Sequence, residues 1–338
     1  MKKIKVSLEV ELINIILYTS KHGDICKNII GFSPIIETNN MYTNEIKNYF
    51  GKFKNHKIYN QIEEMTQNGF FLGRPIELAL SIDMLNDFKS KYEISNTSIE
   101  MSGGQNNIDK LIKLLKRFEK ETDFQNFIPK INSYYVPSIL KINNHLNKYP
   151  FIEATEKFYG STNINYNFIV SNLSKGNFGI DFKNKNNKID IYTVFTLDCI
   201  SKNEDENELN RGALSCNTIF HELSHPIINP ITEKNKKLIN QYKSAYEYLK
   251  TYKTPFSGYA DWEECVNEHI IRAFSIMMTR RYRGDYYADK HLKHDYDLGY
   301  KYIPNLIDKL QDYEKNRDRY KNIECFYEDL ISTFSQTL

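Results

Sequence analysis

The stretch His221-Glu222-Leu223-Ser224-His225 decides how the rest of the chain is interpreted, because it places two histidines four residues apart. On an α-helix, positions i and i+4 lie on one face, so the imidazoles of His221 and His225 can converge on one metal ion. Glu222 lies about 100° around the helix from His221, near enough to reach a water at that metal without being a ligand. The spacing therefore predicts two metal ligands and a general base.

The sequence around this motif predicts a buried helix. Residues 213–220 carry apolar side chains at helical spacing and contain no charged residue. Pro226 directly follows the second histidine, however, and a proline lacks the backbone N–H that would bond to the carbonyl of Glu222. We therefore expect the helix to end or kink at His225.

The composition indicates a globular protein. With 338 residues, of which 41% are hydrophobic, the chain can bury a large core as one large domain or two smaller ones. Its 45 Lys and Arg residues nearly balance its 43 Asp and Glu residues, and its basic runs at 113–117 and 234–237 fall on helical patterns as solvated faces. We therefore expect no nucleic-acid partner.

The sequence also bears on the compartment of the protein. Residues 1–5 resemble the start of a signal peptide, but Glu9 and Glu11 interrupt what would be its apolar region. No apolar segment reaches the length of about 18 residues that a membrane span needs. Reduced thiols suit the scattered cysteines better than disulfides do. These cysteines are Cys26, Cys199, Cys216, Cys265 and Cys325. We expect a cytoplasmic protein unless a leader has been removed, and the sequence fixes no oligomeric state.

Hydrophobic periodicity predicts a helical first part and a mixed second part. In the first part, helical spacing occurs at residues 10–18, 44–53, 75–88, 108–118, 124–146 and 151–158. Short β-prone runs follow at residues 165–171, 179–182 and 188–195. Helical patterns return at residues 232–252, 260–281, 303–316 and 324–334. The charged residues 201–210 are typical of a solvated loop.

A catalytic site of the kind that this motif builds needs a third protein ligand and leaves a fourth position for water. The metzincin extension, a glycine and a third histidine shortly after the motif, is missing from residues 226–232. A second helix at residues 261–273 offers the ligand instead. Its side chains of suitable chemistry are Glu264, Cys265, Glu268 and His269. His291 and His294 form another pair, which we interpret as solvated residues because no apolar frame surrounds them.

At these residues the chain resembles the gluzincins, the thermolysin-like zincins, in which an Asn-Glu pair on the second helix supplies a glutamate ligand. Asn267-Glu268 matches that pair, so the resemblance implies Glu268 as the third ligand. The stretch 221–230, read together with Trp262-Glu263 and residues 267–273, also resembles a bacterial family of predicted metallopeptidases. That family is catalogued only as a domain of unknown function.

The resemblance implies the fold class. We expect an α+β protein that is mostly helical, with a zincin-like catalytic core in which a small sheet packs on the HExxH helix. A helical N-terminal region would occupy residues 1–160, and the catalytic region would occupy residues 161–338. One departure concerns Arg272, which stands where thermolysin-like enzymes have an aspartate that orients a zinc-binding histidine. The surroundings of the ligands must therefore be built differently.

The resemblance also implies an activity, that of a peptidase with one zinc ion and a peptide or protein as substrate. Zinc would lower the pKa of its water towards about 7, and Glu222 would take the proton as the carbonyl is attacked. The strand at 189–195 would align the substrate by backbone hydrogen bonds. Candidates for the oxyanion donor are Tyr259, Arg272, Tyr282, Tyr286, Tyr287, His291 and His294. The alternatives are a zinc hydrolase with a non-peptide substrate and a binding protein that keeps the fold without turnover.

Overall fold

The computed structural model describes residues 4–161, 163–176, 178–184, 186, 188–196, 215–254, 257 and 259–335. These residues form an α+β protein that is mostly helical, as predicted. The chain divides into two compact units. Unit 1 comprises residues 1–147 and 165–201, and unit 2 comprises residues 148–164 and 202–338. This division differs from the expected boundary at residue 160, because the sheet belongs with the N-terminal helices. The predicted charged loop at 201–210 lies outside the described residues.

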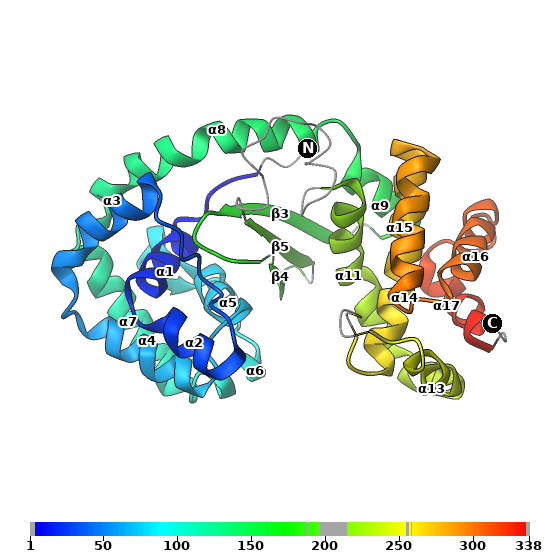
Figure 1. The fold of residues 1–338 in the computed structure, drawn as a ribbon, viewed down its shortest axis with the longest axis horizontal. Helices are drawn as coiled ribbons and strands as arrows, with labels where there is room; N and C mark the ends of the chain where they lie inside the picture. The colour runs from blue at the N-terminus through cyan, green and yellow to red at the C-terminus, as the bar shows by residue number, and fades with distance from the viewer. Residues whose placement is uncertain are drawn as a thin grey trace. The chain divides into compact units, whose positions relative to one another are not determined.

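Unit 1 is built mainly from helices (Figure 1). Its α-helices are α1 (Leu8–Thr19), α2 (His22–Ile30), α3 (Met41–Phe50), α4 (Lys57–Asn68), α5 (Gly73–Ser81), α6 (Asn96–Met101), α7 (Gln105–Glu121) and α8 (Ile128–Leu146). Short 3-10 helices occur at Gly51–Phe53, Met84–Asn86 and Phe124–Phe127. The periodicity of α7 is confirmed, since Ile108, Leu111, Leu115 and Phe118 are all buried.

The predicted strands form one three-stranded sheet of unit 1, with β5 in the middle. The strands are β3 (Ile164–Ser171), β4 (Phe178–Lys183) and β5 (Ile189–Thr196), in the order β3-β5-β4. β4 and β5 pair antiparallel from Phe178 opposite Val194 to Lys183 opposite Ile189. A strand with a neighbour on each side has no open edge for a peptide. The expectation that residues 189–195 align a substrate by strand addition is therefore wrong. A two-residue ladder joins β1 (Ile82–Asp83) to β2 (Lys89–Ser90).

A buried carboxyl lies in the core of unit 1. Glu11, on α1, is fully buried and accepts hydrogen bonds from the hydroxyls of Tyr42 and Tyr135, the latter at 2.8 Å. The Tyr135 hydroxyl in turn accepts the backbone N–H of Asn172 at 2.7 Å. Burial raises the pKa of Glu11 to about 7, although the two tyrosine hydrogen bonds act to lower it. The helices and the end of the sheet are thus joined by one polar network.

The described part of unit 2 is mainly helical (Figure 1), and its helix α11 carries the HExxH motif. Its α-helices are α9 (Phe151–Tyr159), α11 (Cys216–Lys234), α12 (Lys236–Ile239), α13 (Ser244–Lys250), α14 (Trp262–Arg283), α15 (Asp285–Asp297), α16 (Ile303–Lys315) and α17 (Ile323–Ile331). Short 3-10 helices occur at Asn240–Tyr242 and Ser332–Ser335. The helix predicted at 232–252 is divided into shorter pieces, while the other helices predicted in this unit are present. No helix within the described ranges is long and apolar enough to cross a membrane.

The helix of the motif, α11, differs from its prediction. It runs through Pro226 and Pro230 to Lys234, so of the two outcomes expected at His225, an end or a kink, the end is wrong. The lost backbone bond is outweighed by packing of the later turns, where Ile227 and Ile228 are buried. Those turns are anchored further by a hydrogen bond between the hydroxyls of Thr232 and Tyr327, 2.6 Å apart.

Candidate metal centre

Helix α11 is placed by its first turn and by an aromatic cluster. Ser215 caps it, because the Ser215 hydroxyl accepts the backbone N–H of Thr218 at 3.1 Å. Phe220, just before the motif, is fully buried and contacts the rings of Phe274 and Tyr282, with centroids 5.9 and 5.7 Å away. Both of those residues lie on α14, so the first motif histidine is held against that helix.

Helix α14 carries the predicted third ligand. Asp261 caps the helix by accepting the backbone N–H of Glu264 at 2.9 Å, and the indole N–H of Trp262 donates to the Ile239 carbonyl at 2.9 Å. These contacts fix where the helix begins. Glu268 follows two turns later, on the buried side of the helix.

The structure brings the three predicted ligands together. The Nε2 atoms of His221 and His225 are 3.0 Å apart. The Oε1 atom of Glu268 lies 3.8 Å from Nε2 of His221 and 3.5 Å from Nε2 of His225. The side chains are 14%, 28% and 12% exposed in that order, so the group is largely shielded from solvent yet reachable. His221, His225 and Glu268 are therefore a group that could hold a metal ion.

The spacing of these atoms suits a small tetrahedral ion. Around an ion with bonds of about 2.0–2.1 Å to nitrogen or oxygen, tetrahedral ligand atoms lie about 3.3 Å apart. The observed separations of 3.0, 3.5 and 3.8 Å bracket that value. Burial, and then the neighbouring His225 and Arg272, hold the pKa of His221 well below its usual value. His221 is thus a neutral imidazole, the form that binds a metal.

The competing ligands lie elsewhere. Glu264 is exposed and accepts the backbone N–H of Ala260 at 2.6 Å. Cys265 and His269 are fully buried and contact each other, with the ring Nδ1 of His269 3.6 Å from the sulfur. His269 Nδ1 also lies 2.7 Å from the Cys265 carbonyl. None of these three belongs to the ligand group formed by the described residues.

The second histidine pair lies on α15, a helix that hydrophobic periodicity did not single out. His294 is exposed and His291 is half-buried. Neither belongs to the ligand group. Among the expected oxyanion donors, Tyr282 packs its ring on Phe220 and Tyr259 is 2% exposed, as structural aromatic residues are. The role of oxyanion donor stays a prediction.

Glu222 follows His221 on α11 and is half-buried. Burial raises the pKa of the Glu222 carboxyl, and the negative charge of Glu268 raises it further, while His225 and Arg272 lower it. A carboxylate with a raised pKa accepts a proton more readily near neutral pH. The arrangement therefore provides a group of the right chemistry for a general base beside the ligands.

The predicted ligands contact polar side chains that the sequence did not identify for this role. The Nδ1 atom of His225 lies 3.4 Å from Oδ1 of Asn229, one turn later on α11. Arg272 binds Oε2 of Glu268 through Nε and Nη2, both at 2.9 Å. Its Nη1 donates to Oδ1 of the buried Asp295 at 2.8 Å. Asp295 lies on α15, and no short motif connects it to the metal ligands.

The family match agrees with part of the resemblance. The family described as Domain of unknown function (DUF4932) matches residues 3–333. The chain belongs to this family. No curated protein and no solved structure is significantly similar to the chain. Membership in DUF4932 carries no activity with it, so the function of the site has to be inferred from its chemistry.

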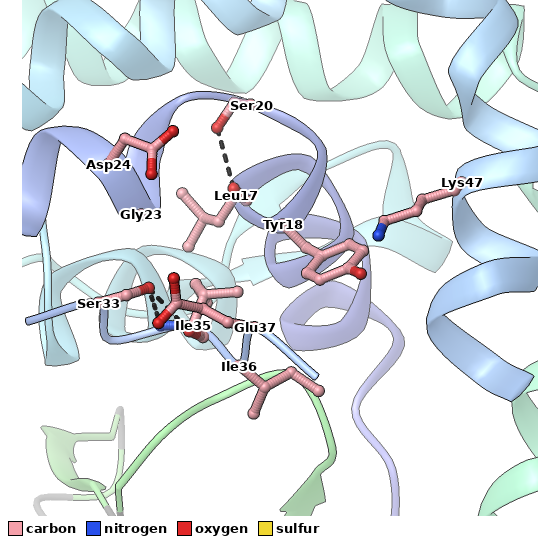
Figure 2. A pocket seen from close by; sticks show the side chains of 10 residues that line it. All are labelled: Leu17, Tyr18, Ser20, Gly23, Asp24, Ser33, Ile35, Ile36, Glu37 and Lys47. Atoms are coloured by element: carbon pink, nitrogen blue, oxygen red, sulfur yellow. Dashed lines mark hydrogen bonds between the residues drawn. The ribbon is translucent and has the colours of Figure 1, made fainter. Parts of the chain in front are cut away.

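Unit 1 contains a hollow of its own, which Figure 2 shows. Its volume is about 190 Å³. Several polar groups at its rim already have partners: the Ser20 hydroxyl donates to the Leu17 carbonyl at 3.0 Å, and the Ser33 hydroxyl donates to the Ile35 carbonyl at 2.7 Å. Glu37 forms an ion pair with a lysine of α2. We assign no ligand to this hollow.

Proposed function

We propose that the protein is a zinc-dependent peptidase of the gluzincin type. The observation that carries the proposal is the convergence of His221, His225 and Glu268, with Glu222 next to the first histidine. Two imidazoles and one carboxylate are the ligand set of catalytic zinc sites that keep a fourth position for the reactants. The His-Glu pair at the start of the motif adds a base that is not a ligand.

In this proposal each side chain has one task. His221, His225 and Glu268 hold the ion. When bound, zinc supplies a Lewis acid that polarises a carbonyl and acidifies water. Glu222 accepts a proton from the attacking water as the new C–O bond forms. When the C–N bond breaks, Glu222 returns that proton to the leaving amine, so the carboxylate is regenerated and one water is consumed per peptide bond.

Metal analysis combined with turnover tests this proposal. The wild-type protein should carry one zinc per chain and cleave members of a peptide library. Glu222→Gln should keep the zinc and lose at least about 100-fold in turnover, because general-base catalysis contributes about 10²–10⁴-fold. Glu268→Ala should lose the metal.

The control is Glu264→Ala, which removes the exposed glutamate one turn earlier on the same helix. This variant should keep both zinc and turnover. Full zinc content in Glu268→Ala together with loss in Glu264→Ala would overturn the ligand assignment. A zinc-loaded wild-type protein that cleaves no peptide but hydrolyses esters or other amides would instead support a zinc hydrolase with a non-peptide substrate.

A further inference from the structure

Arg272 divides the two oxygens of Glu268 between two tasks. Two guanidinium nitrogens, Nε and Nη2, contact the same oxygen, Oε2, at 2.9 Å. The other oxygen, Oε1, is the one that faces Nε2 of His221 and His225. The carboxylate is thus turned with one oxygen to the guanidinium and one oxygen to the metal ligands.

The guanidinium itself is held from two further sides. Its Nη1 donates to Oδ1 of Asp295 on α15 at 2.8 Å, and the Asp295 side chain is only 5% exposed. The ring of Tyr300 lies against the guanidinium, 4.2 Å from its central carbon. A guanidinium stays protonated in a folded protein. Arg272 is therefore a fixed cation.

We propose that Arg272, anchored by Asp295, is a positioning residue that makes Glu268 a ligand through one oxygen only. With Oε2 occupied by two N–H donors, the carboxylate cannot turn both oxygens to the ion. A one-oxygen glutamate leaves the fourth position of a tetrahedral site to the reactants. The proposal rests on the metal site of the proposed function. It gives Arg272 and Asp295 the task of orienting Glu268, whereas the thermolysin-like aspartate at the position of Arg272 orients a histidine.

A purely structural role for the same contacts is the competing explanation. In that case the link between α14 and α15 would contribute to folding, and the coordination of the metal would not depend on it. The two explanations differ in what they predict for the bound metal. Cobalt(II) reports this directly, because the intensity of its visible absorption bands falls when a four-coordinate site gains a ligand.

The test uses the full chain, titrated with zinc and separately loaded with cobalt(II). Arg272→Met should weaken zinc binding about 10–100-fold, the usual effect of removing a group that orients a ligand. It should also weaken the visible bands of the cobalt form, as Glu268 becomes free to bind through both oxygens. Arg272→Lys keeps the charge without the forked donors and should fall between wild type and Arg272→Met. Asp295→Asn should weaken zinc binding less, because an amide oxygen still accepts from Arg272.

The matched control is Arg281→Met on the same helix, which removes the ion pair of Arg281 with Glu314, 2.7 Å apart. It should change neither zinc affinity nor the cobalt spectrum. If Arg272→Met fails to fold, zinc affinity and the cobalt spectrum of Arg272→Lys and Asp295→Asn decide between the positioning role and the purely structural role. Wild-type affinity and an unchanged cobalt spectrum in the Arg272 variants would overturn the positioning role and leave the peptidase proposal intact. If the wild-type protein binds metal and the Arg272 variants show these effects, but no peptide is cleaved, the positioning role stands and the peptidase proposal is overturned. A wild-type protein that binds no metal would overturn both.

Discussion

Replacing the buried Glu11 by glutamine should change how the stability of unit 1 depends on pH. The pKa of Glu11 is about 7 in the folded protein, against 4.5 for an ordinary glutamate. Below about pH 4.5 the carboxyl is protonated in the folded and the unfolded chain, so it has no cost. Between about pH 4.5 and pH 7 the carboxyl is ionised in the unfolded chain but protonated in the folded protein. Folding must then take up a proton, so the free energy of unfolding falls as the pH rises. Above pH 7 the cost is constant.

The size of this effect follows from the two pKa values. The difference between about 7 and 4.5, at about 1.4 kcal/mol per pKa unit, gives about 3 kcal/mol of stability lost at alkaline pH. About 2–3 kcal/mol of that loss falls between pH 5 and pH 8. Glu11→Gln keeps the shape of the protonated carboxyl and cannot ionise. Its free energy of unfolding should therefore rise relative to wild type by about 2–3 kcal/mol over the same range.

The assay has to report on α1. Trp262, the single tryptophan, lies in unit 2, so its fluorescence is unsuitable. Hydrogen exchange of the amides of Leu8–Thr19 in increasing urea, corrected for the intrinsic effect of pH, measures the opening free energy of this helix. Glu64→Gln, at an exposed position of α4, is the control with the same change of charge. A constant gap between wild type and Glu11→Gln from pH 5 to pH 8 would refute the reasoning.

Three further predictions concern unit 2, and Trp262 fluorescence in urea measures each of them. Pro230→Ala, at an exposed position inside α11, should raise the free energy of unfolding by about 2 kcal/mol. A proline inside a helix costs about 3 kcal/mol, and its stiffening of the unfolded chain recovers about 1 kcal/mol. A decrease in the free energy of unfolding would contradict this. Gly160→Ala should lower stability by about 2 kcal/mol or more, since Gly160 has a φ of 71° and an added Cβ would lie 2.4 Å from the Lys321 carbonyl. Zinc at 100 times its dissociation constant should raise the unfolding free energy by about 2.7 kcal/mol, and EDTA should reverse the change; an unaltered urea midpoint would show that the folded site does not bind the ion.

The local part of the site could be predicted from the sequence. Two histidines four residues apart must share a helix face, and the structure places their Nε2 atoms 3.0 Å apart. Glu268 was chosen by resemblance, because residue chemistry alone also allowed Glu264, Cys265 and His269. Cys265, Glu268 and His269 are all buried, but of the four candidates only Glu268 groups with His221 and His225 in the described residues. That grouping depends on how α14 packs on α11, which no local pattern specifies.

The non-local part could not be predicted in this way. Asp295 reaches Arg272 only because α15 packs on α14, and α15 itself has too few apolar residues to show helical periodicity. The end predicted for α11 at His225 was wrong for the same reason, since packing of its later turns compensates for the proline. The grouping of the sheet with the N-terminal helices likewise reflects tertiary contacts, in which residues 165–201 join residues 1–147.

The contact of Arg272 with Asp295 has a consequence for sorting sequences by short motifs. A search for HExxH followed by Asn-Glu would accept any chain that keeps His221, His225 and Glu268 in register. A chain with those residues and an alanine at position 295 would pass the same search, yet its guanidinium would have lost the anchor on α15. A search pattern for family members that keep the proposed site therefore extends to position 295, well beyond the three proposed ligands.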